Sequence, residues 1–137
     1  MSDNTFTPPD PGRERAHREY EGLFRIGDRH GATPEQRARQ SHTEMFEPLG
    51  AVRVVAALAG GSAQLLPDEA PVDDTDITAA LSLLPRARAD MDQLEALLLG
   101  VARQRGMTWK DIAFGLGLGS TQAARQRYER LATRTSP

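Results

Sequence analysis

Hydrophobic residues in the second half of the chain recur at intervals of three and four, the spacing of one face of an α-helix. The longest series starts after Pro85 and predicts a helix to about Arg105. The inward side of this helix would carry Ala87, Met91, Leu94, Leu98 and Val101. Leu97 and Leu99 lie off this series. We therefore expect a second apolar side that a neighbouring helix or a partner chain covers.

Weaker helical signals occur near the N-terminus. The proline-rich, polar residues 1–12 predict a disordered tail, and residues 13–24 predict a helix that is followed by a break at 27–31. The sequence TPEQ at 33–36 is a helix start, with a threonine cap, proline at the first helical position and glutamine three residues after the cap. That helix would run towards Phe46.

The middle of the chain predicts one helix, a linker and a short helix. Pro48 opens the first helix, which would run through Ala59 and stop at the glycines 60–61. Its valines also favour a strand, but no convincing second strand lies nearby to pair with, so a helix is preferred. Residues 64–75 are acidic and contain two prolines, which is typical of a linker. Thr75 or Asp76 would then cap a short helix over 76–84.

Residues 108–134 (TWKDIAFGLGLGSTQAARQRYERLATR) predict two short helices about a tight glycine turn. Thr108 and Asp111 have the spacing of a capping box at the start of the first helix. Gly117 falls where the chain must turn sharply, and a left-handed backbone is most accessible to glycine. Ser120 can cap the second helix. The inward sides would carry Ile112, Ala113 and Leu116 in the first helix, and Ala124, Tyr128 and Leu131 in the second.

Composition modifies this picture through the distribution of charge. The net charge of the 137 residues is -2, which by itself does not favour a nucleic-acid partner. From Gln104 onward, however, six basic residues stand against two acidic ones, whereas residues 64–81 hold five acidic residues and no basic one. Basic charge therefore gathers on the helix–turn–helix stretch, where a phosphate would meet it.

The stretch from Trp109 to Leu131 resembles the helix-turn-helix of small actinobacterial DNA-binding proteins, which is related to that of sigma-factor region four. The resemblance is carried by Trp109, Ile112, Ala113, Leu116, Gly117, Ser120, Gln122, Ala123, Ala124, Gln126, Arg127 and Tyr128. It implies a three-helix unit whose last helix enters the major groove of DNA. This sequence departs from the family pattern at Gly115, inside the first helix, and at Gly119, an extra residue in the turn.

The candidate site residues follow from the side of the second helix that faces outward. Side chains able to pair with base edges are Thr121, Gln122, Arg125 and Gln126. Side chains expected at the DNA backbone are Trp109, Lys110, Ser120, Arg127, Arg130 and Arg134. Trp109 has a second interpretation as a core residue. The extra Gly119 leaves open whether Arg125 or Gln126 is the principal reader of bases.

Other chemistry has little support in the sequence. The chain has no cysteine, which excludes disulfides and zinc–thiolate sites and fits a reducing cytoplasm. Its three histidines, His17, His30 and His42, lack the spacing of a helical metal site. No motif places a catalytic set, so we expect no enzyme, cofactor or metal. No apolar run is long and uninterrupted enough to predict a membrane span or an export signal.

The sequence therefore predicts an all-α protein that binds double-stranded DNA sequence-specifically and regulates transcription. We expect a disordered tail (1–12), a helical N-terminal region (13–63), an acidic linker (64–75) and a helix-turn-helix domain (76–134). One recognition helix reads only a few base pairs, so a homodimer is expected. Contact with RNA polymerase or another regulator, and a cytoplasmic, nucleoid-associated location, belong to the same hypothesis. The alternative is a protein-interaction adaptor that does not bind DNA.

Overall fold

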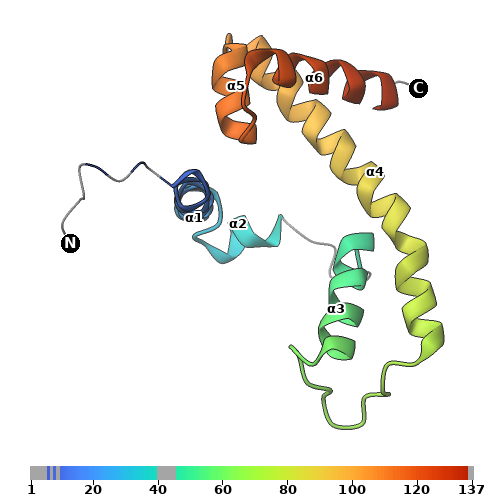
Figure 1. The fold of residues 1–137 in the computed structure, drawn as a ribbon. Coiled ribbons are helices and arrows are strands. Elements are labelled where there is room, and N and C mark those ends of the chain that lie inside the picture. Colours follow the sequence, from blue (N-terminus) through green and yellow to red (C-terminus); the bar gives the residue numbers. More distant parts are fainter. Residues whose placement is uncertain (1–5, 7, 9, 40–45, 136–137) are drawn as a thin grey trace. The chain divides into compact units, whose positions relative to one another are not determined.

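Every regular element in the described part of the protein is an α-helix, which confirms the all-α prediction. The computed structural model describes residues 6, 8, 10–39 and 46–135. Figure 1 shows the helices in order: α1 (Pro11–His30), α2 (Pro34–Ala38), α3 (Pro48–Gly60), α4 (Asp74–Gln104), α5 (Trp109–Leu116) and α6 (Thr121–Thr135). The strand considered for the valines of α3 does not form.

The chain divides into two compact units, Met1–Ser41 and His42–Pro137. The sequence predicted a boundary after residue 63, which would have grouped α3 with the N-terminal helices. Instead α3 belongs to the second unit, because it packs along the N-terminal part of α4. The acidic linker is thus the connection within a helical hairpin.

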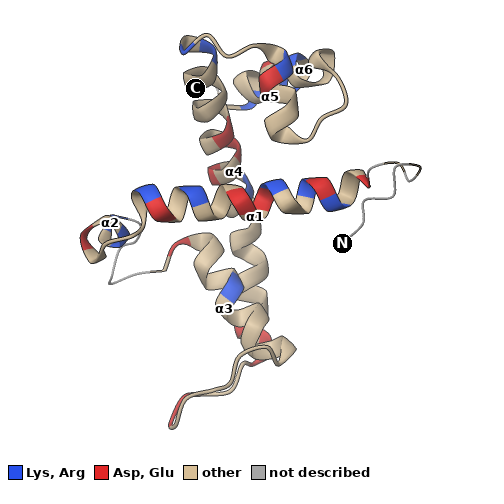
Figure 2. Ribbon diagram, turned by 90° about the vertical axis from the view of Figure 1, so that its left-hand side faces the viewer, with Lys and Arg blue, Asp and Glu red and all other residues tan. Residues whose placement is uncertain are grey.

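Helix α1 is longer than predicted at both ends. It starts at Pro11 because the carboxylate of Asp10 accepts a hydrogen bond from the Gly12 amide at 3.0 Å. Pro11 and Gly12 of the predicted tail are therefore helical, while residues 1–5, 7 and 9 lie outside the described part. The helix also continues through the predicted break to His30, because an isolated glycine at 27 only weakens a helix. Basic and acidic residues both occur along α1 (Figure 2), and it buries none of its side chains.

The predicted capping box of α2 is confirmed. The Gln36 amide donates to the Thr33 hydroxyl and the Thr33 amide to the Gln36 side chain, both at 3.1 Å. The helix ends at Ala38 and does not run towards Phe46, which is non-helical. The Arg39 guanidinium donates to the backbone carbonyls of Gln36 and His30 and so links the end of α2 to the end of α1.

The prediction of two helices over 76–105 is wrong, because α4 is one continuous helix of 31 residues that contains Pro85. Its cap is Asp73, whose carboxylate accepts from the Asp76 amide at 2.8 Å, and not Thr75 or Asp76. A new helix at Pro85 would need a capping oxygen on Leu84, which a leucine lacks. The helix continues instead, at the loss of one backbone donor. The α3 helix stops as predicted, with Gly61 left-handed at φ 85°.

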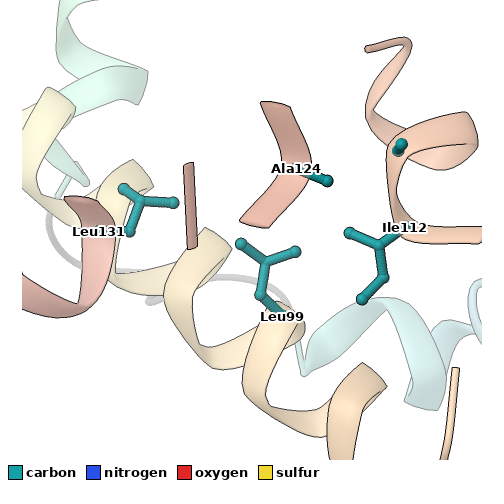
Figure 3. Packing of buried hydrophobic residues seen from close by; sticks show 5 residues of the cluster. Leu99, Ile112, Ala124 and Leu131 are labelled. Atoms are coloured by element: carbon teal, nitrogen blue, oxygen red, sulfur yellow. The ribbon is translucent and has the colours of Figure 1, made fainter. Parts of the chain in front are cut away.

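A small core joins α4, α5 and α6. Its buried side chains are Leu99, Ile112, Ala113, Ala124 and Leu131, which converge from the three helices (Figure 3). The half-buried apolar residues around them are Ala96, Ala102, Trp109, Leu116, Leu118 and Tyr128. The inward residues predicted for α5 and α6 therefore all lie in or against this core.

The inward side predicted for α4 is wrong. Leu99, placed off the predicted series, is 5% exposed, whereas Leu94 and Leu98 of that series are 57% and 67% exposed. The alanines 96 and 102 beside Leu99 pack against the same core, and α6 packs along α4. Asp92 and Glu95 lie on the same side and are satisfied by arginines of α6. Helical spacing alone does not distinguish two apolar sides of one helix.

Candidate functional site

Local hydrogen bonds fix the geometry of α5, the turn and α6. The Asp111 amide donates to the Thr108 hydroxyl at 3.1 Å, and the Thr108 amide donates to the Asp111 carboxylate at 3.2 Å. Gly117 is left-handed at φ 71° and ends α5. The Ser120 hydroxyl accepts from the Ala123 amide at 3.1 Å at the start of α6. The capping box, the turn glycine and the serine cap are thus where the sequence predicted them.

The outward side of α6 presents an exposed polar surface. A shallow depression of about 460 Å³ is lined by Thr121, Gln122, Arg125, Gln126 and Glu129. The four predicted base-reading residues therefore lie together on one exposed side of one helix. Glu129 was not among them, although it follows Arg125 by four residues, a spacing that places both on one side. We name these five residues the α6 outer face.

A second depression extends this surface along α6. It has a volume of about 360 Å³ and is lined by Gln126, Glu129, Arg130 and Thr133. Arg130, a predicted phosphate contact, is exposed there. The polar surface therefore runs over about three turns of the helix, from Thr121 to Thr133.

Two arginines predicted to contact phosphates are paired with carboxylates of α4. Arg127 donates to both oxygens of Glu95, from Nε at 2.5 Å and from Nη2 at 2.9 Å. These hydrogen bonds raise the pKa of the Arg127 guanidinium above its ordinary value, and burial opposes the rise. Arg134 pairs with Asp92 at 3.2 Å. Both ion pairs hold α6 against α4 from the side opposite the α6 outer face.

Trp109 is half-buried at the junction of the three helices. Its ring meets Tyr128 of α6 edge to face, with 5.5 Å between ring centroids. The guanidinium of Arg103 lies 4.5 Å from the ring centroid and that of Arg125 lies 5.7 Å from it, both within cation–π range. Trp109 thus packs against the core, which was its second interpretation, and also supports the base-reading candidate Arg125.

Arg103 is a candidate that sequence reasoning missed. Besides its contact with Trp109, its guanidinium donates to the Met107 carbonyl at 2.8 Å, which fixes it at the end of α4. The available signal was a basic residue in the last turn of a helix, six positions before a tryptophan. Lys110 and Ser120, the other predicted phosphate contacts, are exposed at the starts of α5 and α6.

Comparisons of the chain with models of protein families, with curated proteins and with solved structures found no match. Within the described ranges, no group of histidine and acidic side chains has the arrangement of a metal site. None of the described helices combines the length and the hydropathy that crossing a membrane requires.

Proposed function

We propose that this protein binds double-stranded DNA sequence-specifically, with α5 and α6 as a helix-turn-helix and α6 as the recognition helix. The observation that carries the proposal is the α6 outer face. Thr121, Gln122, Arg125 and Gln126 are side chains that pair with base edges in the major groove. They share one exposed side of a helix whose other side is anchored to a core and two ion pairs.

The anchoring supports a reading role, because side chains that discriminate bases must be held in a fixed register. The cation–π contact with Trp109 restricts Arg125, and a guanidinium is suited to bidentate contact with the O6 and N7 atoms of guanine. Glu129 would accept a hydrogen bond from cytosine N4 in the same groove and would repel phosphates elsewhere. The proposal thus includes both a purine and a pyrimidine contact.

Backbone contacts belong to the residues around this face. Arg130 is exposed in the depression that continues this face, and Lys110 is exposed in the first turn of α5. The start of α6 at Ser120 offers free amides to a phosphate. Arg127 and Arg134 would reach a phosphate only by sharing or leaving their carboxylates. We therefore assign the positioning role first to Lys110, Ser120 and Arg130.

Regulation of transcription by a homodimer, at the nucleoid in the cytoplasm, completes the proposal. Two copies would double the few base pairs that one helix reads. The adaptor alternative has one observation in its favour: apolar side chains of α1 and α4 are exposed and offer a surface to a protein. An adaptor, which could contact RNA polymerase or a regulator, would retain no DNA fragment at low salt.

The test begins with selection of bound fragments from sheared genomic DNA, followed by titration of the selected site. Arg125→Ala should weaken binding to that site by about 1–3 kcal/mol and relax preference at one base pair. Lys110→Ala should weaken all sequences alike and lower the salt slope by about one unit. Arg53→Ala, which removes an exposed cation from α3, serves as the control and should change neither quantity.

Two results would change the proposal. Unchanged binding by Arg125→Ala together with abolished binding by Gln126→Ala would keep the recognition helix and rotate its register by one residue. No retention of any fragment at low salt would overturn DNA binding and favour the adaptor.

A further inference from the structure

A continuous apolar surface on α4 faces away from the core. Its members are exposed by 39% to 67% and lie within three turns of the helix: Met91, Leu94, Leu97, Leu98 and Val101. We name them the α4 apolar face. Single exposed apolar side chains are common on protein surfaces, whereas a contiguous group of them marks a site of association.

The five residues of this face carry no charge, and the paired charged groups of α4 lie beside it or on the core side. Asp92 and Glu95 pair with arginines of α6, and Asp90 pairs with Arg86 at 3.1 Å. Arg103 is engaged with Trp109. A second neutral, apolar surface therefore meets no charge on the face itself.

The face also continues a packing surface that α3 uses. Helix α3 packs along the N-terminal part of α4 (Figure 1). In that part of α4, Ala80, Leu84 and Ala87 are half-buried and repeat at spacings of four and three. The same alternation continues through Met91 to Val101, beyond the reach of α3. A helix of 13 residues is about 20 Å long, so α3 covers less than half of α4, which measures about 46 Å.

The spacing of four of the five members of the face is its own mirror image. Met91, Leu94, Leu98 and Val101 are separated by three, four and three residues. Two antiparallel copies can therefore place Met91 opposite Val101 and Leu94 opposite Leu98, twice each, about one two-fold axis. In that alignment Gln104 of the second copy lies opposite Arg88, just beyond Ala87. The second copy of α4 thus ends where α3 begins to cover this side.

We propose that the α4 apolar face binds the same face of a second copy of this chain, antiparallel, and makes the protein a homodimer. The inference rests on the proposed function in one respect, the homodimer, which it assigns to a surface and an arrangement, and it is measured without DNA, so that its failure and a failure of DNA binding can be told apart. It places the two α6 outer faces in a symmetric pair, as recognition of two half-sites would require.

The first test is sedimentation equilibrium of the full chain at tens of micromolar. We expect twice the 15.0 kDa of one chain. Leu98→Glu should raise the dissociation constant of the dimer at least about a hundredfold, because each dimer loses two buried leucines and gains two buried carboxylates. Leu66→Glu is the matched control, since Leu66 is 71% exposed but lies in the connection between α3 and α4. Circular dichroism should show equal helix content for both variants, because both leucines are exposed.

The second test uses the absence of cysteine from the chain, which makes an introduced pair unambiguous. Met91→Cys mixed with Val101→Cys should form a disulfide between different copies under mild oxidation, and neither variant alone should do so. A disulfide between two copies of Met91→Cys would indicate parallel helices and overturn the antiparallel arrangement. A monomer at tens of micromolar, or a dimer that Leu98→Glu leaves intact, would overturn the proposal and assign the face to another occupant.

Discussion

The pairing of Arg127 with Glu95 leads to the most direct prediction, because it separates a structural role of this arginine from a role in DNA binding. Arg127→Met keeps most of the apolar stem and removes the guanidinium. Its two hydrogen bonds, at 2.5 and 2.9 Å, engage both oxygens of a carboxylate that is 18% exposed. The substitution therefore leaves Glu95 largely shielded from water and without its cation.

The magnitude follows from the geometry. Hydrogen bonds to charged groups contribute about 1.5–3 kcal/mol to stability. The Arg127 side chain is 42% exposed, so solvent screening reduces this contribution to about 1–2 kcal/mol. In a unit of this size, that loss lowers the melting temperature by about 5–10 °C.

The assay is urea unfolding followed by the fluorescence of Trp109, which is the only tryptophan and contacts Tyr128 of α6. Arg130→Met is the matched control, since Arg130 is exposed on the same helix, and its free energy of unfolding should change by less than about 0.5 kcal/mol. A double-mutant cycle with Glu95→Gln should give a coupling energy of about 1 kcal/mol. An Arg127→Met variant that keeps full stability but has a lower salt slope of DNA binding would contradict this structural role. Arg127 would then be a phosphate contact.

Three further predictions concern the backbone, each measured as the free energy of unfolding. Gly115→Ala should stabilise the protein by about 1 kcal/mol, since an added Cβ meets no atom within 4 Å. Gly117→Ala should instead destabilise it by at least about 1 kcal/mol, because the φ of Gly117 is left-handed. Equal effects of the two substitutions would contradict the assigned turn. Ser120→Ala should remove the cap of α6 and lower stability by about 1 kcal/mol, and Ser120→Asp should retain most of it. Pro85→Ala restores an amide that can donate to the Leu81 carbonyl, so it should stabilise α4 and increase the protection of its amides from hydrogen exchange near this position. Unchanged or decreased protection would contradict this expectation.

Local chemistry made parts of the fold predictable. The capping boxes at Thr33 and Thr108, the stop at Gly61 and the turn at Gly117 each depend on residues within four positions of one another. Such signals are readable from sequence because the atoms that satisfy the backbone come from the same short segment. The grouping of polar residues on α6 was predictable for the same reason, through helical periodicity.

The orientation of α4 was not predictable from local signals. Both of its sides are apolar, and the choice of Leu99 over Leu98 is made by α6, which brings Arg127 and Arg134 to acidic residues beside Leu99. From the sequence alone, those acidic residues would be assigned to an outward, polar side of the helix. Only the distant partners reveal that they face another helix, and the pairing of Arg127 with Glu95 was missed for the same reason.

The position of the core along the chain has a consequence for synthesis on the ribosome. Among the described residues, every buried side chain lies from Leu99 to Leu131, so α4 is made before the helices that complete its core. At about 5–20 residues per second, the intervening thirty or so residues take roughly 2–6 s to add. During that interval Leu99 has no core partner, because Ile112, Ala124 and Leu131 follow it in the chain. The core of α4, α5 and α6 can therefore close only after Leu131 has been added.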